Sequence, residues 1–129
     1  SDDRDLWHKR VGYVALPQAD QVYVRVTFGF DSAALAETQK PALRQLCRAM
    51  DEEGVRLFRI IGHTDAAGGD AYNQQLSVLR AEEVARFFVE DCGIAPARLE
   101  AIGVGKRHPF DAADPYAAEN RRVEFQAIS

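Results

Sequence analysis

The chain has 129 residues, of which 47% are hydrophobic and 28% charged, and its 20 acidic and 16 basic side chains give a formal net charge of −4. This composition is typical of a single globular domain, and the mild acidity argues against nucleic acid as the main partner, because binding phosphates requires clustered Lys and Arg. No apolar run approaches the roughly 20 residues of a membrane-spanning helix, so we expect no membrane span in this chain.

The first predicted strand follows a polar N-terminal segment. Residues 1–20 mix charged and polar side chains, and we expect them to form an arm or linker before one domain at 21–129. From Gln21 to Phe28 apolar and polar residues alternate. This period of two predicts a strand with one face on a core.

A helix is predicted next, because apolar residues recur mostly at steps of three and four from Leu35 to Met50. Pro41 fits only the first turn of such a helix, where its missing N–H has no partner to lose. The helix should therefore begin near residues 37–38 and end near residues 53–54.

The short segment Val55–Ile61 is rich in apolar and β-branched residues, which predicts a strand buried on both faces. The loop 62–69 follows, and Asp70 is well placed to cap the next helix. That helix keeps helical apolar spacing until Gly93, a residue typical of a helix end.

Two more strands are predicted at Leu99–Val104 and Arg122–Ile128, separated by a long loop at Gly105–Asn120. The order of elements predicts an α/β fold of the α+β sandwich type, a βαβαβ-β mixed sheet with two main helices packed on one face. Each helical crossover should join parallel neighbouring strands, whereas the last strand can pair antiparallel.

The two cysteines, Cys47 and Cys92, lack the CxxC spacing of a zinc or redox site. They can be two buried thiols, since free cysteine packs as a small hydrophobe. They can also form a disulfide in an oxidising compartment, which would close a loop of 45 residues and stabilise the fold by about 4 kcal/mol. The sequence leaves both alternatives open.

Arg80 lies on or beside the apolar stripe of the second helix, flanked by the polar residues Asn73 and Ser77. Asp65 lies just before the N-terminus of that helix, where free N–H groups and the macrodipole favour an anion. A surface ion pair and a loop acid are the ordinary roles for these two residues. Together they can instead bind a ligand that carries both an ammonium and a carboxylate group.

Several separated motifs occur in a fixed order along the chain. They are Phe28-Gly29-Phe30-Asp31-Ser32 with Leu35, then Gly62-His63-Thr64-Asp65, then Tyr72-Asn73-x-x-Leu76-Ser77-x-x-Arg80-Ala81-x-x-Val84, Gly93-Ile94 with Arg98-Leu99, Gly103-x-Gly105-x-x-x-Pro109, and Asn120-Arg121-Arg122-Val123-Glu124-Phe125. This set covers about residues 22–128 and resembles the OmpA-like peptidoglycan-binding domain, a family that includes the C-terminal domain of OmpA, Pal and MotB-like proteins.

The resemblance implies non-catalytic binding of the peptidoglycan stem peptide, with no cofactor and no metal. In this family the aspartate of the Gly-His-Thr-Asp motif binds the ammonium group of diaminopimelate, and the arginine fifteen residues later binds its carboxylate. Asp65 and Arg80 occupy these places. The resemblance also implies supporting and rim contacts from seven further residues, Thr64, Asn73, Leu76, Arg121, Phe30, Asp31 and Ser32.

The same resemblance implies a location in the periplasm of a Gram-negative bacterium. The domain would belong to an outer-membrane or otherwise envelope-anchored protein whose anchor lies in another part of the full-length chain. One departure from the family concerns Tyr116 and Ala117, which stand where members often carry a Gly-Arg pair. This leaves the conformation of the loop before Asn120 open.

An enzyme is the first alternative function. His63, Asp65 and His108 can serve as metal ligands, or His63 can act as a base toward Ser77. However, His63 and Asp65 alternate on an extended segment and should point to opposite sides. The chain also contains no HExxH, GxSxG or phosphate-loop motif, so we expect no catalysis.

The second alternative keeps the fold but makes it a protein-docking module of an envelope machine, such as a flagellar stator or a secretion apparatus. The basic pairs Lys106-Arg107 and Arg121-Arg122 would then contact a protein, although solvated charge is their ordinary role. The oligomeric state cannot be read from the sequence.

Overall fold

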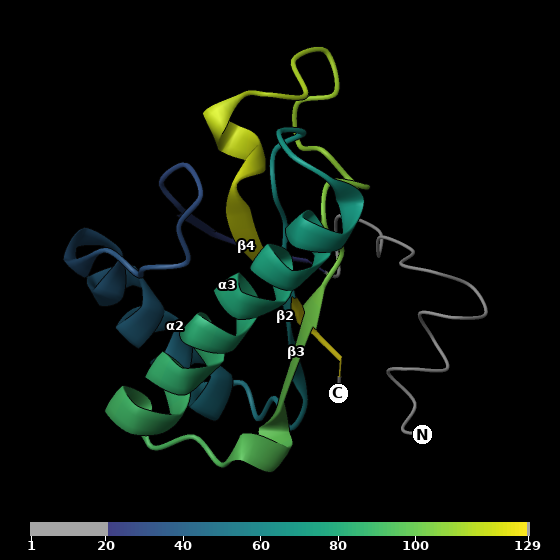
Figure 1. Ribbon diagram of the computed structural model, residues 1–129. Helices are drawn as coiled ribbons and strands as arrows, with labels where there is room; N and C mark the ends of the chain where they lie inside the picture. The colour runs from purple at the N-terminus through teal and green to yellow at the C-terminus, as the bar shows by residue number, and fades with distance from the viewer. Residues whose placement is uncertain (1–20, 129) are drawn as a thin grey trace.

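The computed structural model describes residues 21–128, so the predicted arm at 1–20 lies outside the described residues. The elements are numbered as in Figure 1. The strands are β1 (Gln21–Thr27), β2 (Phe58–Gly62), β3 (Leu99–Gly103) and β4 (Arg122–Ala127), and the helices are α2 (Lys40–Glu52) and α3 (Asp70–Cys92). Short 3-10 turns occur at Glu37–Gln39, Pro96–Arg98 and Ala118–Asn120. Neither main helix, nor any other helix within residues 21–128, is long and apolar enough to cross a bilayer.

The four strands form one mixed sheet in the order β1-β4-β2-β3. β2 and β3 are parallel, and β4 is antiparallel to both β1 and β2. The predicted mixed sheet with two main helices is therefore confirmed. The expectation that β1 and β2 are neighbours is wrong, because β4 lies between them. The crossover through α2 still makes β1 and β2 run in the same direction. The two strands are separated by the width of one strand, and β4, the last strand in the chain, occupies that position.

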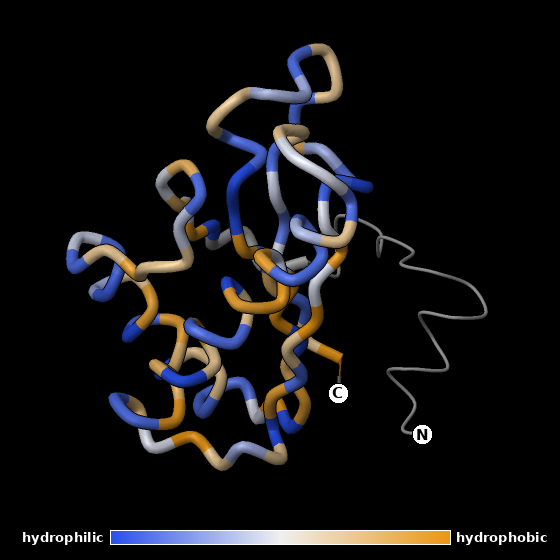
Figure 2. The backbone as a smooth tube through the Cα atoms, in the orientation of Figure 1, coloured by the Kyte–Doolittle hydropathy of each residue, from blue (hydrophilic) through white to orange (hydrophobic). Residues whose placement is uncertain are grey.

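Both helices pack on the same core as the sheet. α3 crosses the sheet in front of β2 and β3, as Figure 1 shows, and Figure 2 shows hydrophobic segments where helices and strands run side by side. Three buried aromatic rings form the centre, with ring centroids 5.6 Å apart between Phe58 and Phe125 and 5.8 Å apart between Phe88 and Phe125. These rings belong to the main cluster of buried apolar side chains, and Ile61, Ile102 and Val104 form a second, smaller cluster.

The helix boundaries differ from the predicted ones by a few residues. Pro41 lies in the first turn of α2, as predicted, but the regular helix begins at Lys40 after a 3-10 turn. Gly93 ends α3 in the left-handed conformation, with φ 69°. Asp70 is not the cap of α3, because Gly69 holds that position and the Asp70 carboxylate lies 3.3 Å from Lys106 Nζ instead.

Strand β2 is shorter than predicted, because residues 55–57 are not part of the sheet. The Val55 N–H donates to the Met50 carbonyl at the end of α2, and the Val55 carbonyl accepts a hydrogen bond from Arg98 Nη2 at 2.6 Å. Both backbone groups of Val55 are therefore used before the ladder begins. Cys47 and Cys92 form a disulfide that joins α2 to the last residue of α3, so the structure favours the second of the two alternatives.

Two glycines allow α3 to lie directly against the sheet. A Cβ atom on Gly62 would lie 1.8 Å from the carbonyl oxygen of Ser77, and one on Gly103 would lie 2.5 Å from the backbone nitrogen of Val78. Ser77 also bonds the turn after β3, because its Oγ accepts a hydrogen bond from the Gly105 N–H at 2.9 Å. These contacts fix the N-terminal half of α3 beside the carboxyl ends of β2 and β3.

Candidate functional site

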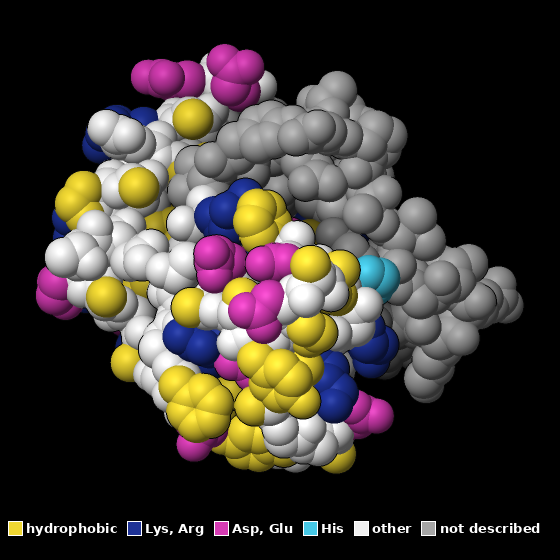
Figure 3. Space-filling model, turned by 90° about the horizontal axis from the view of Figure 1, so that it is seen from above, with side chains coloured by type: hydrophobic (Ala, Val, Ile, Leu, Met, Phe, Trp, Pro, Cys, Tyr) yellow, Lys and Arg dark blue, Asp and Glu magenta, His cyan; other side chains and the backbone are white. Residues whose placement is uncertain are grey.

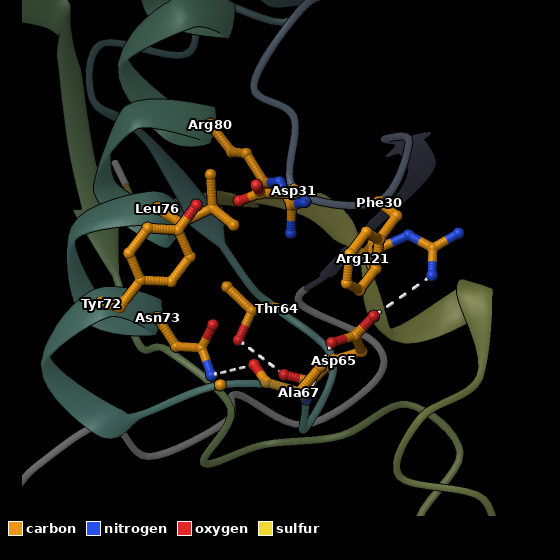
Figure 4. Close-up of a pocket in the computed structure, with 11 residues that line it drawn as sticks. Phe30, Asp31, Thr64, Asp65, Ala67, Tyr72, Asn73, Leu76, Arg80 and Arg121 are labelled. Atoms are coloured by element: carbon orange, nitrogen blue, oxygen red, sulfur yellow. Dashed lines mark hydrogen bonds and ion pairs between the residues drawn. The ribbon is translucent and has the colours of Figure 1, made fainter.

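A pocket of about 310 Å³ opens at the carboxyl ends of β1 and β2, beside the first turns of α3 (Figure 4). Its walls come from four segments, which are the turn after β1, the loop after β2, the N-terminal half of α3 and the residue just before β4. It is lined by Phe30, Asp31, Thr64, Asp65, Ala67, Gly68, Tyr72, Asn73, Leu76, Arg80 and Arg121.

The structure brings eight of the nine predicted site residues to this pocket. The exception is Ser32, whose side chain does not line it but whose carbonyl bonds Arg80. Sequence reasoning missed Ala67, Gly68 and Tyr72. The Tyr72 side chain, which the motif that begins at Tyr72 includes without a role, is half exposed. Because Tyr72 directly precedes Asn73, a predicted site residue, its position in the sequence could have indicated that it lines the pocket.

Asp65 is held in place by hydrogen bonds to both of its carboxylate oxygens. Oδ1 accepts from the Ala67 N–H at 2.9 Å, and Oδ2 lies 3.1 Å from Arg121 Nη1. Arg121 is fixed in turn, because its Nε donates to the carbonyl of Phe28 at 2.9 Å. Asp65 is therefore a nearly buried, oriented carboxylate that already faces one guanidinium group.

Arg80 is fully buried, and its guanidinium group donates to three backbone carbonyls. Nε bonds Ser32 at 2.8 Å, Nη1 bonds His63 at 2.9 Å, and Nη2 bonds Gly29 at 3.2 Å. Burial lowers the pKa of Arg80 to about 10, against the attraction of Asp65, so the group stays charged at neutral pH. A guanidinium has five N–H donors, and three of them are used by these backbone carbonyls.

The loop that carries Asp65 is shaped by two short hydrogen bonds. Thr64 Oγ1 donates to the Asp65 carbonyl at 2.9 Å, and Asn73 Nδ2 donates to the Ala67 carbonyl at 2.8 Å. Leu76 and the ring of Tyr72 supply an apolar wall beside these polar groups, as Figure 4 shows. The pocket thus combines two acids, Asp31 and Asp65, with two guanidinium groups and hydrocarbon, which suits a ligand with charged ends and an aliphatic middle.

The residues of the enzyme alternative do not lie together. His63 is buried with Nε2 3.2 Å from Glu124 Oε1, whereas Asp65 faces Arg121 in the pocket. Ser77 Oγ donates to the Gln74 carbonyl rather than to an imidazole. Among residues 21–128 no group of three His, Cys, Asp or Glu side chains could hold a metal ion.

Protonation of His63 should make the fold sensitive to mild acid. Its pKa is lowered from 6.5 to about 4, mainly by burial and also by the nearby charge of Arg122, although the hydrogen bond to Glu124 opposes the shift. Between about pH 6.5 and pH 4 the His63 imidazole therefore binds a proton in the unfolded chain but not in the native state. We expect the free energy of unfolding to fall by about 2 kcal/mol between pH 7 and pH 5 in urea titrations.

The variant His63→Gln should remove most of this pH dependence. His108→Gln is the matched control and should keep it, because His108 is only partly buried. Equal slopes for the native chain and the His63 variant over this pH interval would show that another group causes the effect.

Comparisons with known proteins identify similar chains. The OmpA family matches residues 27–122. Outer membrane porin F of Pseudomonas fluorescens is 37% identical over 109 residues, which are 83% of this chain but 33% of that protein. The crystal structure of the peptidoglycan-associated lipoprotein from Burkholderia pseudomallei is 32% identical, with a TM-score of 0.69, and the match covers 79% of this chain and 87% of that one.

A further similar structure is that of the cell wall anchor of the T6SS from Pseudomonas aeruginosa, which is 28% identical with a TM-score of 0.64. That match covers 80% of this chain and 75% of the other. The chain thus corresponds to most of these two solved chains and to about a third of the porin.

Proposed function

This chain belongs to the OmpA family, and from this we propose that it binds the stem peptide of peptidoglycan without catalysis and so anchors an envelope protein to the cell wall. Two of the similar structures support this function by their names, a peptidoglycan-associated lipoprotein and a cell wall anchor. The observation that carries the proposal is that Asp65 and Arg80 line the same pocket.

In the proposed complex the ammonium group of diaminopimelate binds Asp65 and its carboxylate binds Arg80. Asp65 can accept the ammonium because its two oxygens have lone pairs beyond those used by Ala67 and Arg121. Arg80 has two N–H groups beyond its three backbone bonds, enough for one carboxylate. Leu76 would contact the methylene groups between the two charges.

The fixed positions of both charged groups favour recognition of a zwitterion. Arg80 cannot swing toward solvent without breaking three backbone hydrogen bonds, so little conformational entropy is lost when a ligand binds. The small contact area nevertheless predicts weak binding per site, on the order of micromolar to millimolar. Many sites on a polymeric wall would raise the apparent affinity through avidity.

This function places the domain in the periplasm of a Gram-negative bacterium, with the membrane anchor in another part of the full-length protein. The similarity to a T6SS anchor also favours a second candidate, a docking module of an envelope machine built on the same fold. The two candidates differ in one observable property, because only the first requires binding to purified cell wall.

The variant Asp65→Asn should reduce co-sedimentation with purified diaminopimelate-type peptidoglycan at least about tenfold. The change removes the charge that pairs with the ligand ammonium but keeps the shape of the side chain, and hydrogen bonds between charged groups contribute about 1.5–3 kcal/mol. The matched control is Asp70→Asn, which removes an exposed acid five residues away whose side chain does not line the pocket.

Three outcomes separate the candidates. Loss of sedimentation in Asp65→Asn but not in Asp70→Asn supports wall binding through the pocket. Equal sedimentation of both variants and the native chain removes Asp65 from the site. Absence of sedimentation for the native chain favours the docking module.

A further inference from the structure

Two exposed aromatic side chains line the pocket and a third is carried by the loop bonded to Ala66, and none of the three takes part in the proposed ionic contacts. Phe30 is 68% exposed and Tyr72 is 50% exposed, and they stand on opposite sides of the pocket in Figure 4. Tyr116 is 66% exposed and follows directly on Pro115, whose carbonyl accepts a hydrogen bond from Ala66 beside Asp65. We call these three residues the aromatic rim.

Tyr116 is presented by a loop of fixed shape. The buried side chain of Asn120 donates through Nδ2 to the carbonyls of Asp114 and Pro115, and its Oδ1 accepts from the Asp111 N–H at 2.8 Å. The Tyr116 N–H bonds Asp114 Oδ1 at 3.3 Å. The loop therefore holds this ring at the surface rather than letting it fold onto the core.

The other two exposed large apolar side chains in the described part of the chain differ from the rim. The ring of Phe110 is covered by the Arg25 guanidinium at 4.0 Å, and Leu79 lies on α3 outside the pocket lining. Figure 3, seen from above, shows hydrophobic side chains interspersed with acidic and basic ones on this end of the molecule. Exposed aromatic residues gathered beside a pocket are typical of a ligand-binding surface.

The chemistry of the rim fits a sugar ring. Aromatic faces bind the apolar C–H faces of pyranose rings, and rigid side chains such as Tyr lose little entropy when they do so. In peptidoglycan the diamino acid is the third residue of a stem that is attached to the glycan. Three extended residues span at most about 10 Å, so a sugar cannot lie far from a stem bound in the pocket.

We propose that the aromatic rim binds an N-acetylhexosamine ring of the glycan strand, so that the domain recognises a sugar together with its stem. This inference rests on the proposed function and extends the same site outward. It predicts that the disaccharide-bearing stem binds more tightly than the stem alone. Stacking on one ring should raise the affinity about three- to tenfold.

Titration with two soluble probes tests the proposal, the free diaminopimelate tripeptide and the same tripeptide attached to its disaccharide. The native chain should prefer the second probe, and Tyr116→Ala should reduce that preference while leaving the tripeptide affinity unchanged. Tyr116→Phe should keep the preference, since it keeps the ring. Leu79→Ala is the matched control, because it removes an exposed apolar side chain that lies outside the pocket lining.

Each result has one meaning. Equal affinities of the native chain for the two probes, or a preference that survives in Tyr116→Ala, would overturn the glycan contact and leave the proposed function standing. Failure of both probes to bind would overturn the proposed function and this inference together. Self-association of the native chain that Tyr116→Ala abolishes would assign the rim to a second copy of the chain instead.

Discussion

Replacing Gly62 with alanine should cost the domain at least about 3 kcal/mol of folding free energy, measured by urea unfolding at neutral pH. The new Cβ would lie 1.8 Å from the carbonyl oxygen of Ser77, an atom of the α3 backbone that cannot rotate away. Helix and sheet would have to separate along their closest contact, and overpacking of this kind costs 1–3 kcal/mol or more even at side chains. A domain of this size has only about 5–15 kcal/mol to lose.

Gly69→Ala is the matched control for this prediction. Gly69 lies seven residues further along, at the end of the loop that follows β2, but a Cβ there would meet no atom within 4 Å. We expect a loss below about 1 kcal/mol, from the cap of α3 alone. A similarly small loss for Gly62→Ala would mean that α3 and β2 tolerate a wider separation than the structure shows.

Replacing Arg80 with methionine should destabilise the fold by about 3–5 kcal/mol and abolish binding to cell wall. Methionine has a similar length but leaves the carbonyls of Gly29, Ser32 and His63 without their donor. The His63 carbonyl is buried, and a buried carbonyl without a partner costs about 1–3 kcal/mol, whereas the bonds to Ser32 and Gly29 are partly buried. The Asp65 carboxylate also loses a nearby positive charge.

Two further variants make this prediction specific. Arg86→Met removes a fully exposed arginine from the same helix, and we expect little change in stability. Arg80→Lys keeps the positive charge, but its ammonium group lacks the planar fork that lets arginine bond three carbonyls at once. We therefore expect it to recover only part of the lost stability. Full stability in Arg80→Met would show that the turn after β1 does not depend on this side chain.

The sequence predicted most elements because their local patterns are strong. The alternation in β1, the helical spacing of α3 and the glycine at its end all lie within single segments. The position of β4 between β1 and β2 could not be predicted in this way, because it depends on which pairing buries the most apolar surface over the whole sheet.

The same limit applies to the site. Asp65 and Arg80 were predicted from their positions relative to one helix, and both line the pocket. The backbone partners of Arg80 at Gly29 and Ser32 lie about fifty residues away in the sequence, and Arg121 is 56 residues from Asp65. No local pattern specifies such contacts, so the resemblance to a family, rather than periodicity, predicted Arg121.

The register of β1 against β4 has a mechanical consequence. Gln21 pairs with Gln126 at one end of the ladder, and Thr27 pairs with Arg122 at the other end, next to the pocket. If the pocket holds the wall, a pull on the chain before Gln21 acts along the two strands rather than across them. The hydrogen bonds between β1 and β4 would then be loaded together, in shear, rather than broken one after another.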